Sequence, residues 1–140
     1  MSKPDNPDFE RYSRQTRYAP IGQAGQARLR DSRVLVCGCG ALGSVLANTL
    51  ARAGVGNLRI VDRDFLDMSN LQRQVLYDEN DVAAGMPKAI AAQAHLQNIN
   101  SQIQTEANVA DLNHVNLEMH TTHLPCLLDT TDHYQIRYPP

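Results

Sequence analysis

Residues 38–43 have the sequence Gly38-Cys39-Gly40-Ala41-Leu42-Gly43, a complete G-x-G-x-x-G pattern. The apolar run Arg33-Val34-Leu35-Val36-Cys37 precedes it and predicts a strand covered on both faces, as in the centre of a parallel sheet. After the pattern, apolar residues recur at helical spacing up to Gly54, which predicts a helix from Ala41 to Ala53 with a left-handed glycine cap. The order of strand, glycine-rich turn and helix is typical of an α/β fold.

The rest of the sequence continues this alternation. The predicted elements that follow are a strand at 58–62, a helix at 87–99, a strand at 103–109, a short helix from an Asp111 cap through Met119, a strand at 126–129 and the start of a helix at 134–138. We therefore predict an α/β, Rossmann-like doubly wound sheet that is mostly parallel, has helices on both faces and is truncated on its C-terminal side. We expect residues 1–10 to form a flexible N-terminus and residues 11–140 to form the domain.

The composition disfavours several classes of protein. At 140 residues the chain fits one domain, and it has 42% hydrophobic and 20% charged residues. It contains no apolar run near the ~20 residues that a membrane span needs. A net charge of −2 offers no basic surface for a nucleic acid. The first residues lack the apolar core of a signal peptide, so we expect a soluble, cytoplasmic protein without a membrane or nucleic-acid partner.

The cysteines and histidines do not have the spacing of a metal site. Cys37, Cys39 and Cys126 fit neither a disulfide framework nor a paired zinc motif, so we predict three reduced thiols. The histidines His114, His120 and His123 include one H-x-x-H spacing. A zinc site needs three or four converging ligands, and neither a helical turn nor a paired carboxylate fixes these histidines in place. We therefore expect no zinc site in this chain.

Asp62 adds a ligand-binding signal to the glycine pattern. It stands about 20 residues after the last glycine, where an acidic side chain can accept hydrogen bonds from ribose hydroxyls. Gly38, Gly40 and Gly43 would let the backbone approach a phosphate at the positive end of the following helix. Dehydrogenases and methyltransferases share this pattern, and a tight turn without a ligand is the simplest alternative.

A polar run separates these possibilities. It consists of Asp62-Arg63-Asp64, Ser69-Asn70-Leu71-Gln72-Arg73-Gln74 and Lys88. The positive charges of Arg73 and Lys88 could neutralise the phosphates of a nucleoside triphosphate during attack at the α-phosphate, a need that dehydrogenases lack. Asp132 follows the last predicted strand and offers oxygen ligands to Mg²⁺. Taken singly, each of these residues has a simpler explanation as a solvated side chain or a helix cap.

Two further motifs extend the pattern to both ends of the chain. Arg11-Tyr12-Ser13-Arg14-Gln15 precedes the first strand, and Asp129-Thr130-Thr131-Asp132 follows the last one. From Arg11 onward, nearly the whole sequence resembles the ThiF/MoeB/HesA family, whose motifs occur in the same order. The resemblance implies an adenylyltransferase, similar to ubiquitin-activating enzymes, that uses ATP and Mg²⁺ to activate the C-terminal Gly-Gly carboxylate of a small ubiquitin-like sulfur-carrier protein. It also implies a homodimer, and a C-terminal half with the carrier-protein cleft that is missing here.

The resemblance also assigns roles to single residues. It implies that Asp62 binds the ribose and that Asp132 binds magnesium, while Arg14 reaches into the nucleotide site of the partner subunit. The catalytic residues would be Arg73, Lys88, Asp132 and Arg14. The nucleotide contacts would come from Gly38, Gly40, Ala41, Gly43, Asp62, Asp64, Ser69, Asn70, Leu71, Gln72, Arg73 and Lys88. Asn70, Arg73 and Lys88 would contact the phosphates. His133 departs from the pattern, because the family usually has Asn there.

Two other functions are compatible with the sequence. One is a nicotinamide-dependent oxidoreductase that uses the same glycine turn and Asp62. The other is a non-catalytic remnant that binds a nucleotide or pairs with a relative. Binding of ATP with Mg²⁺ in preference to NADH would separate the adenylyltransferase from the oxidoreductase. Binding without turnover would indicate the remnant.

Overall fold

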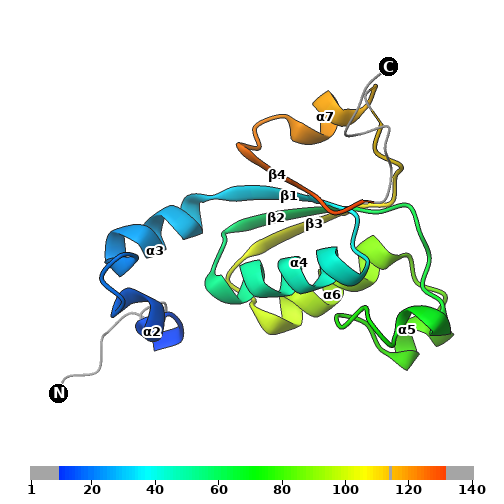
Figure 1. Cartoon of the computed structure of the whole chain (residues 1–140), viewed down its shortest axis with the longest axis horizontal. Helices are drawn as coiled ribbons and strands as arrows, with labels where there is room; N and C mark the ends of the chain where they lie inside the picture. The colour runs from blue at the N-terminus through cyan, green and yellow to red at the C-terminus, as the bar shows by residue number, and fades with distance from the viewer. Residues whose placement is uncertain (1–9, 114, 132–140) are drawn as a thin grey trace.

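The computed structural model describes residues 10–113 and 115–131. Two N-terminal helices, α2 (Ser13–Thr16) and α3 (Gly22–Asp31), lead into an alternation of strands and helices (Figure 1). The elements that follow are β1 (Arg33–Cys37), α4 (Ala41–Ala53), β2 (Asn57–Val61), the 3-10 helix η1 (Met68–Asn70), α5 (Glu79–Ala83), α6 (Lys88–Ile99), β3 (Gln104–Asn108), α7 (Leu117–Thr121) and β4 (Cys126–Asp129). The predicted α/β order is confirmed.

The four strands form one parallel sheet in the order β3-β2-β1-β4. β1 pairs with both β2 and β4, so the apolar run at 33–37 is internal, as predicted. Cys37 pairs with Val61 on one side and with Asp129 on the other, which brings the carboxyl ends of three strands level. The chain moves outward from β1 to β3 and then returns to place β4 on the other side of β1. Doubly wound sheets bind ligands at this kind of switch in strand order.

Helices cover both faces of the sheet, but unequally. Figure 1 shows α4 and α6 on one face and α7 on the other. The larger core lies on the α4 and α6 face and includes Val34, Val36, Leu58 and Ile60 together with alanines of both helices. The smaller core, on the α7 face, consists of Leu35, Cys37, Val61 and Leu112. The predicted cover on both faces is therefore confirmed, with the thicker layer on the side of α4 and α6.

Helix α4 packs against the sheet through small residues. Its buried positions are Gly43, Ser44, Ala47 and Ala51, whereas the larger Leu42 and Val45 are exposed. Small side chains allow the helix backbone to approach the strands closely. The helix ends at Gly54, whose φ of 88° is the predicted left-handed cap. The Tyr12 ring covers this cap so tightly that a Cβ on Gly54 would lie 2.6 Å from it.

Some boundaries differ from the prediction. Strand β2 begins and ends one residue earlier than predicted, so Asp62 follows the strand instead of ending it. The helix predicted to start at an Asp111 cap is wrong in its start, because α7 begins at Leu117 with Asn116 as its N-cap. The Asp111 carboxylate instead pairs with Arg63.

Other parts of the chain were either unpredicted or lie outside the described residues. Helices α2 and α3 were not among the predicted elements, because their sequences have no regular apolar stripe. The predicted flexible N-terminus, apart from Glu10, and the helix predicted at 134–138 lie outside the described residues. In the part of the chain that the structure describes, no helix combines the length and the apolar composition of a bilayer span.

Candidate functional site

A cavity of about 520 Å³ opens at the carboxyl ends of the strands. Its volume lies within the roughly 300–1,000 Å³ typical of small-molecule sites. Eight of the predicted site residues line it: Gly38, Gly40, Ala41, Asp62, Asp64, Asn70, Arg73 and Lys88. These residues come from the turn after β1, the segment after β2, the turn at η1 and the start of α6. The fold therefore brings together most of the residues that the sequence singled out.

A different structural reason explains the glycine at each of the three positions of the motif. Gly38 has a φ of +83°, a left-handed conformation that favours glycine. A Cβ on Gly43 would lie 2.0 Å from the carbonyl oxygen of Gly38, so close packing of α4 excludes a side chain there. A Cβ on Gly40 would meet, among the described residues, a single atom within 4 Å, Nε2 of Gln74 at 3.6 Å. Glycine at position 40 therefore leaves open space at the cavity wall, as close approach of a ligand requires.

The N-terminus of α4 lies against the cavity. Ala41 and Leu42 line it, and the N-cap residue Gly40 has no side chain to accept a hydrogen bond from the first turn. The first N–H groups of a helix have no partner within the helix, and the helix dipole adds partial positive charge. This end of the cavity is therefore suited to a phosphate group.

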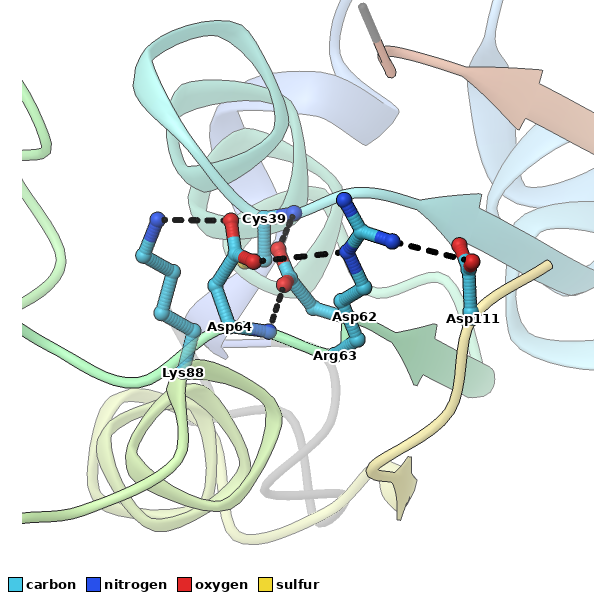
Figure 2. Close-up of polar contacts among 6 residues, drawn as sticks. All are labelled: Cys39, Asp62, Arg63, Asp64, Lys88 and Asp111. Atoms are coloured by element: carbon cyan, nitrogen blue, oxygen red, sulfur yellow. Dashed lines mark hydrogen bonds and ion pairs between the residues drawn. The ribbon is translucent and has the colours of Figure 1, made fainter. Parts of the chain in front are cut away.

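Asp62 holds the glycine turn in place. Its Oδ2 accepts a hydrogen bond of 2.7 Å from the backbone N–H of Cys39, and its Oδ1 accepts one of 2.8 Å from Asp64 (Figure 2). The residue is only 9% exposed. A carboxylate oxygen can accept more than one hydrogen bond, so this arrangement leaves capacity for a ligand hydroxyl group. Asp62 thus has a structural role that the sequence analysis did not anticipate.

A row of alternating charges crosses the cavity. Lys88 Nζ lies 3.4 Å from Asp64 Oδ2, Arg63 Nε lies 3.6 Å from Asp64 Oδ1, and Arg63 Nη1 donates to Asp111 Oδ2 at 3.0 Å (Figure 2). The Arg63 pairs are half exposed, and such pairs contribute only about 0–1 kcal/mol to stability. The Lys88 side chain, however, is only 8% exposed. A largely desolvated ammonium group therefore lines the cavity with an exposed carboxylate beside it.

The turn at η1 presents Asn70 and Arg73 to the cavity. The carboxylate of Asp67 accepts a hydrogen bond from Ser69 N–H, which lowers the pKa of Asp67, and the Asn70 side chain accepts one from Asp67 N–H. The Asp67 side chain also accepts from the backbone N–H of Asn70, so that Asp67 and Asn70 form a reciprocal capping box that fixes the turn. Arg73 Nη1 donates to the carbonyl oxygen of Ser69 at 3.0 Å. The remaining predicted members of this turn, Ser69, Leu71 and Gln72, do not line the cavity.

Two cysteines beside the glycine turn, Cys37 and Cys39, are fully buried. Burial, reinforced by the charge of Asp129, raises the pKa of the Cys37 thiol to about 12. Burial likewise raises the pKa of the Cys39 thiol to about 12. The Tyr77 hydroxyl donates a hydrogen bond of 2.6 Å to the carbonyl oxygen of Cys39. The three cysteines are free, as predicted, and Cys126 alone is exposed.

The end of β4 forms the opposite wall of the cavity. Thr130 is anchored to the glycine turn, because its single Oγ1–H is shared between the carbonyl oxygens of Cys37 at 2.8 Å and Gly38 at 2.7 Å. Thr130 and Thr131 both line the cavity. The predicted magnesium ligand Asp132 and the neighbouring His133 lie outside the described residues.

Arg14 lies at the other end of the domain. Its neighbour Gln15 donates to the carbonyl oxygen of Ala53, the last residue of α4, and Arg11 donates to Ile99, the last residue of α6. The N-termini of both helices lie at the cavity, and a helix the length of α4 spans about 20 Å. Figure 1 shows α2 at the end of the sheet where β1 begins. The structure therefore does not bring Arg14 to the cavity of its own chain.

Several lining residues were not predicted as site residues: Leu42, Val61, Arg63, Gln74, Ala110, Asp111, Leu112, Thr130 and Thr131. Arg63, Gln74, Thr130 and Thr131 lie inside motifs that carried the family resemblance, so a signal for them was available. Residues 110–112 had no such signal, because only the return of the chain from β3 toward α7 brings them to the cavity. Gly43 lies behind the wall, where it supports the turn.

One group in the described part of the chain has the composition of a metal site: Asp78, Asp81 and His95. Both carboxylates already act in a capping box at the start of α5. Asp81 Oδ2 also lies 2.7 Å from His95 Nε2. These contacts account for the group as a structural link between α5 and α6. Neither His120 nor His123 belongs to it.

A parallel sheet with a glycine turn and a cavity of about 520 Å³ at its switch in strand order defines a Rossmann-like α/β domain of the nucleotide-binding type. The ThiF family profile matches residues 12–140. The chain belongs to the ThiF family.

Named relatives agree with this assignment. The chain is 44% identical over 127 residues to a "Sulfur carrier protein ThiS adenylyltransferase" of Bacillus subtilis, covering 91% of this chain and 38% of the relative. It is 40% identical over 127 residues to a "Molybdopterin-synthase adenylyltransferase" of Haemophilus influenzae, covering 91% of this chain and 51% of the relative. The solved structure of Escherichia coli MccB with ATP is 32% identical, with a TM-score of 0.70, and the match covers 78% of this chain and 33% of MccB. The chain thus spans between a third and about half of these proteins.

The packing of the glycine turn gives a first prediction. Gly43→Ala places a methyl group against the Gly38 carbonyl, so we expect it to lower the free energy of unfolding by about 1–3 kcal/mol, as overpacking does. Urea unfolding followed by circular dichroism measures this. Thr49→Ala, on the exposed face of the same helix, is the matched control and should change the value by about 0.5 kcal/mol or less. Equal unfolding free energies for Gly43→Ala and wild type would contradict the packing described here.

Proposed function

We propose that the cavity binds ATP. The observation that carries this proposal is the convergence of two cations, Arg73 and Lys88, on a cavity that the N-terminus of α4 also lines. A triphosphate concentrates negative charge, and these three features can offset it. The open space at Gly40 gives the phosphates room. MccB, a relative by structure, has been solved with ATP.

The proposed reaction is adenylation of a carboxylate. The carboxylate attacks the α-phosphate, the bond to the β-phosphate breaks, and an acyl-adenylate and pyrophosphate result. The named relatives are adenylyltransferases, one of them for the sulfur carrier protein ThiS, rather than nicotinamide-dependent oxidoreductases. The proposed partner is therefore a small ubiquitin-like carrier protein with a C-terminal Gly-Gly. The activity belongs to a protein of the relatives' length, because this chain spans 38% to 51% of theirs.

Each residue of the site then has a proposed role. Asp62 accepts the ribose hydroxyls while it holds the turn, Asn70 donates to the phosphates, and Arg73 and Lys88 offset the negative charge that develops during attack. Mg²⁺, held by an oxygen ligand from Asp132, would supply additional charge neutralisation at the phosphates. The ammonium group of Lys88 lies beside the carboxylate of Asp64. When ATP binds, it would exchange this ion pair for one with the phosphates.

Arg14 is proposed to act in the neighbouring subunit of a homodimer. Its place at the far end of the sheet, beside the C-termini of α4 and α6, keeps it from the cavity of its own chain. A two-fold dimer can bring such a residue to the partner's cavity, because each subunit presents the same surface to the other. The exposed Arg14 guanidinium would then add a third cation to the phosphates.

ATP binding is tested with Asp62→Ala. The variant removes two backbone hydrogen bonds and the proposed ribose acceptor, so we expect the ATP dissociation constant to rise at least about tenfold. Isothermal titration calorimetry with ATP and Mg²⁺ measures this. Asp31→Ala, an exposed carboxylate at the end of α3, is the control. Equal ATP affinity of wild type and Asp62→Ala would contradict the proposal.

The chemistry is tested by pyrophosphate exchange. A chimera in which this chain replaces the matching part of the Bacillus relative should exchange labelled pyrophosphate into ATP when a carrier protein ending in Gly-Gly is present. Arg73→Ala or Asp132→Ala should lower this rate by about 10²–10³-fold, because each removes a group positioned at developing charge. Arg52→Ala, on the exposed side of α4, is the control. The 140-residue chain alone should show no exchange, and robust carrier-dependent exchange by it would refute our proposal that the carrier cleft lies outside this chain.

Site sharing is tested by mixing subunits of the same chimera. Arg14→Ala and Lys88→Ala should each abolish exchange, whereas a mixture should regain one intact site in every mixed dimer. With random pairing, half of the dimers are mixed, so activity should return to about a quarter of the wild-type value. Native mass spectrometry confirms that mixed dimers form. No recovery in a sample with confirmed mixed dimers would show that Arg14 does not serve the partner.

A further inference from the structure

Gln74 is the one residue of the 69–74 motif that lines the cavity without a role in the reaction above. It is 4% exposed, and its backbone is fixed by hydrogen bonds to Asn70 and Tyr77. Its side-chain Nε2 lies beside the glycine turn, 3.6 Å from the position of a Cβ on Gly40. The amide group therefore stands next to the N-terminus of α4, where a phosphate is expected.

The other end of this amide has no partner. Among the described residues, Gln74 Oε1 is the one enclosed side-chain oxygen or nitrogen atom without a hydrogen bond. An enclosed polar atom without a partner lowers stability, and native proteins retain few of them. A methionine has a similar length and flexibility and would fill the same space without that cost. Packing alone therefore does not explain a glutamine at this position.

We propose that Gln74 is a phosphate-binding residue of the nucleotide site, and that its Nε2 donates a hydrogen bond to a phosphate oxygen at the glycine turn. This inference rests on the proposed ATP binding. An amide offers a directional N–H donor without a full charge, so it orients the phosphate where Arg73 and Lys88 neutralise it. The amide oxygen accompanies the amide nitrogen, which explains why the fold contains an unpartnered oxygen behind the cavity wall.

The inference is tested with Gln74→Met. The variant keeps the volume and removes both the donor and the unpartnered oxygen, so its melting temperature should equal or exceed that of wild type. Its ATP dissociation constant should rise about tenfold or more, because a hydrogen bond to a charged group is lost. Its affinity for adenosine, which has no phosphate, should stay unchanged. Gln74→Glu should weaken ATP binding further, because it places a carboxylate beside the phosphates, and should leave adenosine binding unchanged.

Gln93→Met is the matched control. Gln93 donates a hydrogen bond of 2.8 Å to the carbonyl oxygen of Thr105, away from the cavity. Its loss should lower the melting temperature and leave ATP affinity unchanged, which is the reverse of the pattern expected for Gln74→Met. The inference is overturned if Gln74→Met binds ATP as wild type does, or if it loses stability and adenosine affinity together. No ATP binding by wild type would instead contradict the proposed function, and this inference with it.

Discussion

The site depends on the carboxylate of Asp62. This nearly buried group accepts the backbone N–H groups of Cys39 and Asp64 and so joins the turn after β1 to the segment after β2. Hydrogen bonds to a charged acceptor are each worth about 1.5–3 kcal/mol, more than neutral ones. The parallel register places Cys37 opposite Val61, so the two segments leave the sheet side by side. One side chain then fixes both the glycine turn and the start of the charged row.

Two further segments dock onto this joined pair. Tyr77 donates to the carbonyl oxygen of Cys39, which fixes the end of the segment that carries Arg73. The backbone N–H of Lys88 donates to the carbonyl oxygen of Asp64, which sets the start of α6 beside the same turn. Cations far apart in the sequence therefore line one cavity. The positions of these charged side chains therefore depend on hydrogen bonds to backbone groups rather than on the weak ion pairs between exposed side chains.

Small buried residues allow two helices to pack closely against the sheet. Gly43, Ser44 and Ala47 bring α4 against the sheet, while Ala89 and Ala92 do the same for α6. Close helices keep the glycine turn and Lys88 near each other. On the opposite face the cover is thin, and residues 110–112 close the cavity there through Leu112 and the Arg63–Asp111 pair. The two faces of the sheet thus contribute different residues to the cavity: the glycine turn and Lys88 on one side, and residues 110–112 on the other.

The sequence by itself determined the fold class and eight of the seventeen residues that line the cavity. The apolar run of β1, the glycine pattern and Asp62 are local signals, because strand burial, turn geometry and helix caps depend on neighbouring residues. Tertiary structure decided what depends on distant contacts. Asp111 pairs with Arg63 instead of capping a helix, Asp62 accepts hydrogen bonds from two backbone N–H groups, and Gln74 lies beside Gly40 with an unpartnered oxygen. These relations join residues from separate segments, and no periodicity along the chain records which segments will meet.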